Sequence, residues 1–129
     1  HVVTAQSNKI EGFEVDMYGS ATMVNDKGQI AQLAFGMDND YRCEIEIWGS
    51  KGTITSGRIL TAPAGFAPSY TIKKNQDIET RPLAADDAFL KSIYRFIACV
   101  EDKETRTEEY NLMLKQEQLV NEFIQNINK

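Results

Sequence analysis

The sequence predicts an α+β fold in which an open-faced, mainly antiparallel sheet carries helices on one face, as a two-layer sandwich. Segments with period-2 alternation of polar and apolar residues fill the first two thirds of the chain. Two amphipathic helical patterns fill the last third. The linker Asn25-Asp26-Lys27-Gly28 joins two alternating runs and is typical of a β-hairpin. Because strands come first and helices last, we expect the helices to cover one face of the sheet.

The predicted strands are short and follow one another closely. They span Val2 to Ser7, Tyr18 to Val24, Gln29 to Phe35, Tyr41 to Trp48, Thr53 to Ser56, Arg58 to Thr61, Ser69 to Lys74 and Ile78 to Leu83. The stretch Ala62 to Pro68 is the clearest loop, because its two prolines cannot donate to a sheet ladder. Which side chains share a face depends on the strand register, and the sequence leaves this open.

Two helices are expected after the strands. Asp86-Asp87 offers an N-cap for the first helix, and Glu101 to Glu104 is a polar stretch that should end it. Its apolar stripe consists of Phe89, Ile93, Phe96, Ile97 and Val100. The second helix should start at Thr107-Glu108-Glu109, where negative charge favours a helix N-terminus. Its stripe consists of Leu112, Leu119, Val120, Phe123 and Ile127.

Length and composition indicate one globular domain over residues 1–129. The net charge of −5 argues against nucleic acid as a partner, because phosphate-binding surfaces need clustered Lys and Arg. No apolar run approaches the ~20 residues that span a bilayer, and no signal-peptide pattern is present, so a cytoplasmic location is expected. Cys43 and Cys99 have no metal-ligand or Cys-x-x-Cys spacing and are expected to be buried free thiols.

No motif with catalytic chemistry stands out. Gly49-Ser50-Lys51-Gly52 is similar to part of a phosphate loop, but a strand follows where a phosphate loop needs a helix, which favours a hairpin turn with a solvated Lys51. The chain has no Gly-x-Gly-x-x-Gly fingerprint for a dinucleotide. The single histidine, His1, begins the chain, where residues are usually frayed, and it is too isolated for a catalytic triad or a metal site.

The spacing of two pairs of carboxylates makes them candidates for acid–base chemistry. Residues two apart on one strand share a face, so Glu44 with Glu46, or Asp38 with Asp40, could lie together. The sequence implies no hydrophobic pocket that would shift their pKa, so a solvated strand edge is the better interpretation. We therefore expect no catalytic, cofactor-binding or metal-binding residues in the chain itself.

One block of the chain resembles a known enzyme family. It runs through Phe35-Gly36-Met37-Asp38, Tyr41, the stretch Glu44 to Ile54 and Arg58-Ile59-Leu60-Thr61. It resembles the C-terminal domain of the glucose–fructose oxidoreductase / inositol dehydrogenase / MocA (Gfo/Idh/MocA) family of NAD(P)-dependent oxidoreductases. The resemblance covers most of the chain, and its specific part is roughly Gly36 to Pro68.

This resemblance implies that the chemistry lies outside the chain. In the family, an N-terminal Rossmann domain binds NAD or NADP and carries a catalytic Lys, and a His that opens a helix transfers the proton. His1 directly precedes the Val2-Val3 strand without an intervening helix, so it does not match that His. We therefore expect an upstream Rossmann domain of about 150–200 residues to be missing, and this chain alone to be inactive. The family's open sheet face forms the subunit interface, which implies a homo-oligomer.

The same residues also resemble those of family members that act on nucleotide-linked sugars or surface-polysaccharide precursors. This resemblance implies substrate contacts from Asp38, Tyr41, Arg42 and Arg58. The arginines would bind a sugar hydroxyl or a diphosphate, and Tyr41 and Phe66 would stack on a ring. The competing interpretation is structural: an Arg on a strand commonly pairs with a carboxylate such as Glu44 or Glu46, and Trp48 commonly packs on the sheet.

Two functions from different classes remain open at this point. The first is the substrate-binding and oligomerisation domain of an NAD(P)-dependent sugar oxidoreductase, which predicts an apolar open sheet face and a symmetric dimer. The second is a free-standing α+β interaction or small-ligand-binding module without enzymatic activity. It predicts a monomer with an enclosed pocket between sheet and helices. Neither hypothesis fixes which sugar is bound or whether NAD or NADP is used.

Overall fold

Seven strands precede two helices in the computed structural model, which describes residues 1–128. The elements are β1 Val2–Asn8, β2 Tyr18–Val24, β3 Ile30–Gly36, β4 Glu44–Gly49, β5 Gly52–Gly57, β6 Ser69–Lys74, β7 Asp77–Pro82, α1 Ala88–Glu101 and α2 Lys103–Ile127. The α+β class predicted from the sequence is confirmed, and all strand pairs are antiparallel.

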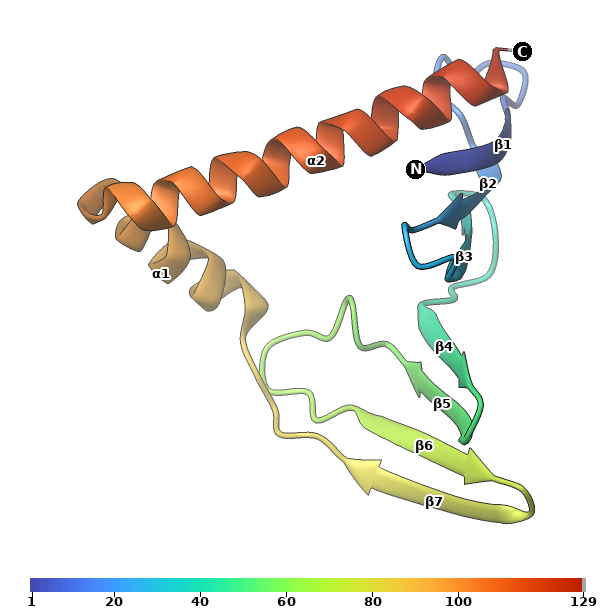
Figure 1. Ribbon diagram of the computed structural model, residues 1–129, viewed down its shortest axis with the longest axis vertical. Coiled ribbons are helices and arrows are strands. Elements are labelled where there is room, and N and C mark those ends of the chain that lie inside the picture. The colour runs from blue at the N-terminus through green and yellow to red at the C-terminus, as the bar shows by residue number, and fades with distance from the viewer. Residues whose placement is uncertain (129) are drawn as a thin grey trace. The chain divides into compact units, whose positions relative to one another are not determined.

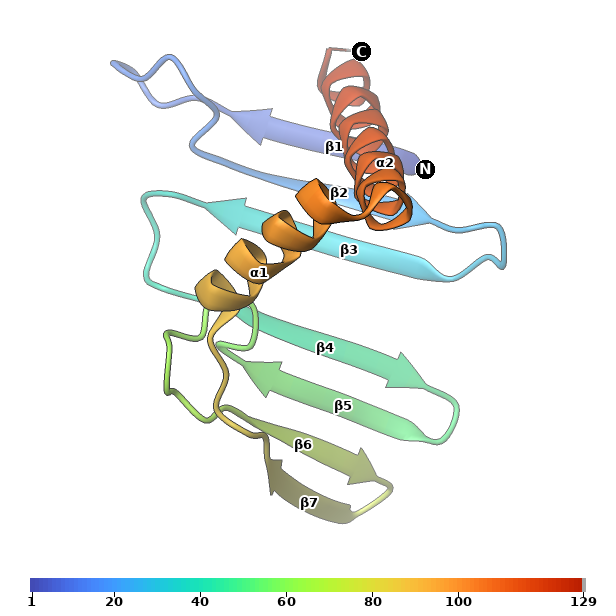
Figure 2. The ribbon, with the colours of Figure 1, turned by 90° about the vertical axis from the view of Figure 1, so that its left-hand side faces the viewer.

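The strands form two sheets, where the sequence suggested a single one. Their orders are β1-β2-β3 and β4-β5-β6-β7, each following the chain as a meander (Figure 2). The first sheet belongs to a unit of residues 1–40 and 102–128, and the second to a unit of residues 41–101.

One face of the first sheet is apolar, and a β-bulge in β1 places a further apolar side chain on that face. The bulge lies between Val2 and Thr4. In a regular strand Val2 and Ala5 would point to opposite faces, but the extra residue shifts the alternation. Both side chains are therefore buried on one face, together with Ala21 of the central strand. The bulge thus enlarges the small core of this unit.

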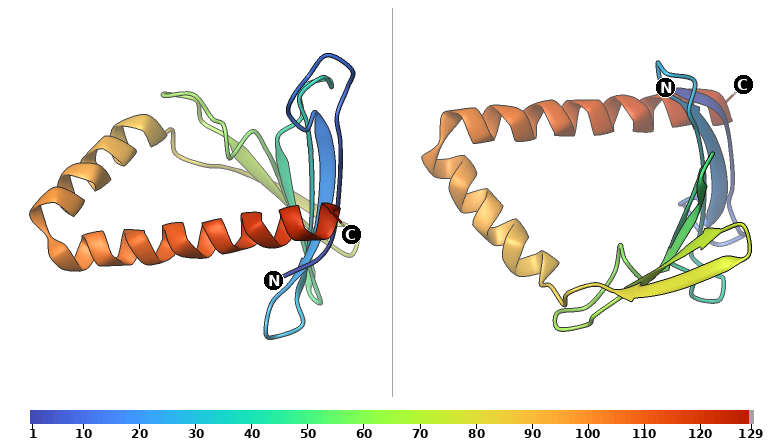
Figure 3. Two further views of the ribbon diagram at one scale, coloured as in Figure 1. Left: turned by 90° about the horizontal axis from the view of Figure 1, so that it is seen from above. Right: turned by 60° about the horizontal axis from the view of Figure 1, so that its bottom comes forward.

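The C-terminal end of α2 lies against the first sheet at β1 (Figures 1 and 3). Leu119, Phe123 and Ile127, spaced at i, i+4 and i+8, pack against the buried cluster. The Phe123 ring lies 6.2 Å from the Phe35 ring of β3 at 58°, a tilted aromatic pair. Phe35 needs Gly19 beside it, because a Cβ at Gly19 would come within 2.8 Å of the Phe35 ring.

Polar side chains of α2 also bind the backbone of β1. The Glu122 carboxylate accepts a hydrogen bond from the Val2 N–H at 2.7 Å, and the Asn126 amide donates to the Val2 carbonyl at 3.4 Å. Gln118 donates to the other oxygen of Glu122 at 2.9 Å. Because β1 is an edge strand, these contacts satisfy backbone groups that no further strand pairs with.

The predicted hairpin turn between β2 and β3 is built by Asn25. Its side-chain oxygen accepts hydrogen bonds from the N–H groups of Lys27 and Gln29, both at 3.0 Å. Gly28 has a φ of +74°, a conformation that glycine adopts without strain. The Asn and Gly signals in the sequence therefore correspond directly to the turn.

The second sheet shows the same division into faces. The register of β4 with β5 places Glu44, Glu46 and Trp48 on one face, and Ile45 and Ile47 on the other. Ile54 of β5 lies opposite Ile47 and Ile72 of β6, which extends the apolar face. No helix packs on this face within residues 41–101, and Ile45, Ile47 and Ile54 are 39–54% exposed.

The β4–β5 connection is the hairpin expected from Gly49-Ser50-Lys51-Gly52. Gly49 pairs with Gly52 across a two-residue turn, and Lys51 is exposed. Gly52 has a φ of +148°, and a Cβ there would lie 2.4 Å from the carbonyl oxygen of Lys73. Both the turn and the neighbouring strand thus require glycine at this position.

The helix starts are set by aspartate caps. The Asp87 carboxylate accepts a hydrogen bond from the Leu90 N–H at 2.9 Å, as the sequence predicted for the first helix. Asp102 accepts from the Thr105 N–H at 2.6 Å and caps α2. The predicted start of the second helix at Thr107 is therefore wrong by four residues, because the polar stretch before it contains this cap.

One predicted strand is absent. The stretch from Arg58 to Thr61 is not extended but bends away after β5, and Arg58 has a φ of +52°. This left-handed conformation ends the strand in the way a glycine often does. The segment from Arg58 to Ala67 instead forms one continuous loop before β6.

Candidate functional site

The loop after β5 and the segment before β4 form a cluster of aromatic and cationic side chains. The Arg58 N–H donates to the Cys43 carbonyl at 2.5 Å, which holds the start of the loop against the segment before β4. The Arg58 guanidinium carbon lies 5.7 Å from the centre of the Tyr41 ring and 5.4 Å from the centre of the Phe66 ring. Both distances fall within the range of a cation–π interaction. Tyr41 and Arg58, two of the predicted substrate contacts, are thus brought together.

A hydrogen bond between hydroxyl groups fixes the tyrosine. The Tyr41 hydroxyl and the Thr61 hydroxyl are hydrogen-bonded, so the loop returns to the segment before β4 a second time. The same Thr61 hydroxyl is the main reason why the pKa of the Cys43 thiol is lowered. Cys43 is half-buried rather than fully buried, as is Cys99 of α1. The expected burial of the two thiols is therefore incomplete, and neither Cys43 nor Cys99 forms a disulfide.

Arg42 takes part in a different contact. Its guanidinium forms an ion pair with the Glu44 carboxylate, and both side chains are largely exposed. The hydrogen bond from Arg42 lowers the pKa of the Glu44 carboxyl. This is the structural role that the sequence suggested as the alternative for a strand arginine. Arg42 consequently already has a carboxylate partner, whereas Arg58 has two aromatic rings.

The fourth predicted contact, Asp38, belongs to the other unit. It lies in the bend that follows β3 and is exposed. Its neighbour Met37 is 75% exposed, and the Met37 N–H donates to the Met17 carbonyl at 2.8 Å. The bend after β3 is therefore tied to the segment before β2.

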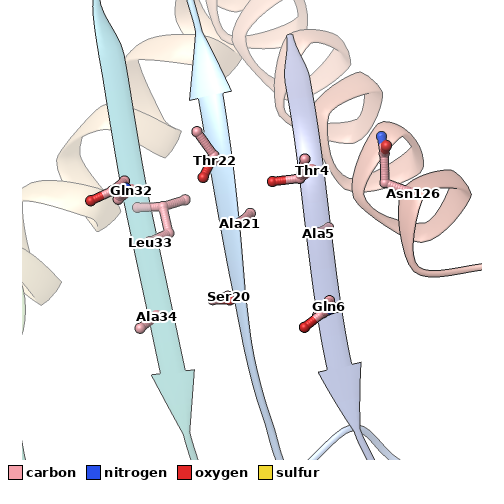
Figure 4. Close-up of a pocket in the computed structure, with 10 residues that line it drawn as sticks. All are labelled: Thr4, Ala5, Gln6, Ser20, Ala21, Thr22, Gln32, Leu33, Ala34 and Asn126. Carbon is pink, nitrogen blue, oxygen red and sulfur yellow. The ribbon is translucent and has the colours of Figure 1, made fainter.

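A shallow hollow lies on the first sheet and was not anticipated from the sequence. It has a volume of about 630 Å³, and its walls come from all three strands and from Asn126 of α2 (Figure 4). Its lining residues are Thr4, Ala5, Gln6, Ser20, Ala21, Thr22, Gln32, Leu33, Ala34 and Asn126. None of them titrates near neutral pH, so this surface can offer hydrogen bonds but no general acid, base or nucleophile.

The strand register corrects the expectation of an apolar open sheet face. Across the first sheet Gln6 lies opposite Ser20, and Thr4 lies opposite Thr22, which in turn lies opposite Gln32. These residues alternate with Ala5 and Ala21, which face α2, so they form the face away from the helix. That face also carries Val24, Ile30 and Ala34, so it is mixed rather than substantially apolar, with hydroxyl and amide groups near its centre. The sequence could not show this, because it depends on the register.

The carboxylate pairs show no sign of acid–base chemistry. Glu44 and Glu46 share a face, as expected from their spacing, and line a hollow of about 290 Å³ with Thr55 and Thr71. Both glutamates are exposed, and the pKa of Glu44 is lowered rather than raised. Within residues 1–128 no group of three or more His, Cys, Asp and Glu side chains could hold a metal ion. In the same part of the chain no helix is long and apolar enough to cross a membrane.

Comparison with known proteins finds several related reductases. The chain is 35% identical over 107 residues to the dTDP-3,4-didehydro-2,6-dideoxy-alpha-D-glucose 3-reductase of Actinomadura kijaniata. This alignment covers 83% of this chain and 32% of that enzyme. It is 30% identical over 95 residues to the enzyme of the same name from Saccharopolyspora spinosa, over 74% of this chain and 29% of that enzyme. No protein-family model matches the chain.

The structure agrees with these relatives. It superposes on a mutant of KijD10, a 3-ketoreductase from Actinomadura kijaniata crystallised with TDP-benzene and NADP, with a TM-score of 0.86 and 32% identity, over 93% of this chain and 38% of that one. An open conformation of KijD10 with the same two ligands gives a TM-score of 0.73 over 78% of this chain and 32% of that one, at 33% identity. These homologues are oxidoreductases of the Gfo/Idh/MocA type.

The similarity to these reductases confirms the resemblance to the Gfo/Idh/MocA family seen in the sequence. The chain spans about a third of the length of the curated relatives that it matches. The superposition on the KijD10 mutant reaches across 93% of the chain. The contacts among Tyr41, Arg58 and Phe66 thus lie in a domain fold that this family uses.

Proposed function

We propose that this chain is the substrate-binding and oligomerisation domain of an NADP-dependent oxidoreductase that acts on a nucleotide-linked sugar, and that it is not catalytic alone. The similarity to the KijD10 mutant over 93% of the chain, with a TM-score of 0.86, is the observation that carries this proposal. That relative was crystallised with NADP and TDP-benzene, a nucleotide-linked ligand. NADP would be held by a Rossmann domain outside this chain, and a cytoplasmic location stays a prediction.

The residues of the second unit fit a role in substrate binding. Tyr41, Arg42 and Arg58 provide two cations and an aromatic ring within one short stretch of structure. Asp38 is exposed and offers a carboxylate for sugar hydroxyls. We infer that these four residues contact the substrate. A nucleotide-linked sugar carries a diphosphate, a set of hydroxyls and a planar base, and these groups suit guanidinium, carboxylate and aromatic side chains respectively.

Self-association through the open face of the first sheet is part of the proposal. Thr4, Gln6, Ser20, Thr22 and Gln32 lie on that face, carry no charge and can donate and accept hydrogen bonds, and Val24 and Ile30 add apolar side chains. Two such faces can pack without like-charge repulsion, and a symmetric dimer would place the same patch on both subunits. A Thr22→Lys variant would place a cation near the centre of this face and is expected to dissociate the dimer in analytical ultracentrifugation.

The proposal is tested by the size and activity of the native protein. An antibody against this domain should detect a species of about twice 14.6 kDa or more in its own cells. The purified native protein should then oxidise NADPH in the presence of a dTDP-linked 3-ketosugar, and the 129-residue chain should not. A native species of 14.6 kDa would contradict the proposal and favour a free-standing interaction or small-ligand-binding module.

A further inference from the structure

We propose that Arg58, held between Tyr41 and Phe66, is the residue that binds the diphosphate of the nucleotide, with Thr61 and Phe66 as its positioning residues. This inference rests on the proposed function and narrows it to one anchoring side chain. Three features of the structure support it: a strained backbone, a fixed side chain and a charge that no carboxylate offsets.

The backbone of Arg58 adopts a conformation that arginine normally avoids. Its φ of +52° lies in the left-handed region, where a side chain with a Cβ is strained. A glycine would fit this turn without strain, and Gly57 directly precedes it. Strained residues of this kind concentrate at ligand sites, where the surrounding structure holds them in place. Here the hydrogen bond from the Arg58 N–H to the Cys43 carbonyl supplies that restraint.

The side chain of Arg58 is fixed by its two aromatic neighbours. Its guanidinium carbon lies at similar distances from both ring centres, 5.7 Å for Tyr41 and 5.4 Å for Phe66. The Tyr41 ring is itself held through its hydroxyl by Thr61. Two aromatic contacts restrict the flexible arginine before any ligand arrives, so less conformational entropy is lost on binding.

The charge of Arg58 is not offset by a carboxylate. Within residues 1–128 its guanidinium has neither an ion-pair partner nor a hydrogen-bond acceptor. The loop from Arg58 to Ala67 contains no Asp or Glu. In contrast, Arg42 pairs with Glu44 and Arg81 pairs with Glu79. Because a guanidinium presents N–H donors in a planar fork that matches phosphate oxygens, the unpaired Arg58 is the best anion anchor of the three.

The test compares two ligands that differ only in the diphosphate. Binding of thymidine diphosphate and of thymidine to the intact native protein would be measured by isothermal titration calorimetry. An Arg58→Gly variant removes the guanidinium and also relieves the backbone strain, so it should fold. It is expected to weaken binding of thymidine diphosphate about tenfold or more and to leave that of thymidine within about twofold. Arg58→Lys keeps the charge without the fork and should give an intermediate loss.

The matched control is Arg81→Ala, which removes the same charge from an arginine paired on β7. It should leave thymidine diphosphate binding within about twofold, because long-range charge effects are screened by salt. Arg42→Ala should cause a smaller loss than Arg58→Gly, since the charge of Arg42 is already offset. Equal affinity of the wild-type and Arg58→Gly proteins for thymidine diphosphate would overturn the anchor while leaving the proposed function intact. Failure of the wild-type protein to bind either thymidine diphosphate or NADPH would overturn both.

Discussion

Both sheets of this protein are antiparallel meanders with an apolar face, but the side chains on the two apolar faces differ in burial. In the first sheet, Leu119, Phe123 and Ile127 of α2 pack over Val2, Ala5 and Ala21, and these three strand residues are buried. In the second sheet, Ile45, Ile47 and Ile54 form an equivalent face and remain 39–54% exposed. The same alternation therefore produces a core only where a helix with matching spacing lies on it.

The two units also differ in their contents: the first contains the residues that stabilise the fold, and the second contains the candidate binding residues. The first unit contains the helix–sheet core and the hydrogen bonds from Glu122 and Asn126 to the β1 backbone. The second unit contains the Arg58 cluster and has little buried apolar area among residues 41–101. Binding residues commonly lie on loops that a scaffold of strands holds in place, as the Arg58 loop is held by the segment before β4.

The largest expected effect comes from reversing the two faces of the first sheet. Ala21→Asp places a carboxylate in the buried cluster beneath α2, where nothing can pair with it. We expect it to lower the free energy of unfolding by more than about 3 kcal/mol in urea denaturation. Ser20→Asp puts the same group one residue away on the opposite face and should cost about 1 kcal/mol or less. Similar losses for the two variants would contradict the assignment of the faces.

The next largest effect is expected at the turn of the second sheet. Gly52→Ala adds a Cβ 2.4 Å from the Lys73 carbonyl oxygen at a φ of +148°. The clash and the strain should together cost about 2–4 kcal/mol, measured as a lower free energy of unfolding. Gly57→Ala, in the same strand, meets no atom within 4 Å and serves as the matched control. If Gly57→Ala were as destabilising as Gly52→Ala, the β5–β6 contact would not explain the requirement for glycine.

Much of the fold could be predicted from the sequence, because local signals decided it. The range of β2 and that of β6 agree with the prediction residue by residue, and the Asn25 turn and the Asp87 cap lie where the sequence placed them. Predictions were wrong where one sequence pattern is compatible with two local structures. The polar stretch before α2 was interpreted as a stop, although Asp102 within it is a cap. Division into two sheets depends on pairing between strands, which periodicity does not report.

The candidate site was predictable only in part. Tyr41 and Arg58 were named from the resemblance, and the structure places them in contact. The roles of Thr61 and Phe66 as supports depend on the loop conformation, and no spacing rule reveals that conformation. One sequence signal was available: a loop of ten residues with a single cation and no carboxylate. The partner of Arg42 was also foreseeable, because Glu44 lies two residues away.

The smallest expected effect is the pH dependence of the contact between α2 and β1. The hydrogen bond from the Val2 N–H, followed by that from Gln118, lowers the pKa of Glu122 below its ordinary value of 4.5. The stabilisation from this carboxylate is therefore fully present above pH 4.5 and is lost as the pH falls through the lower pKa of the folded protein. Glu122→Gln should flatten the decrease in stability on the acid side, as followed by thermal unfolding from pH 3 to pH 6. Glu117→Gln, an exposed change on the same helix, should leave that decrease in place. The acid-sensitive step should appear in the hydrogen exchange of β1, because Glu122 accepts its hydrogen bond from the backbone of that strand.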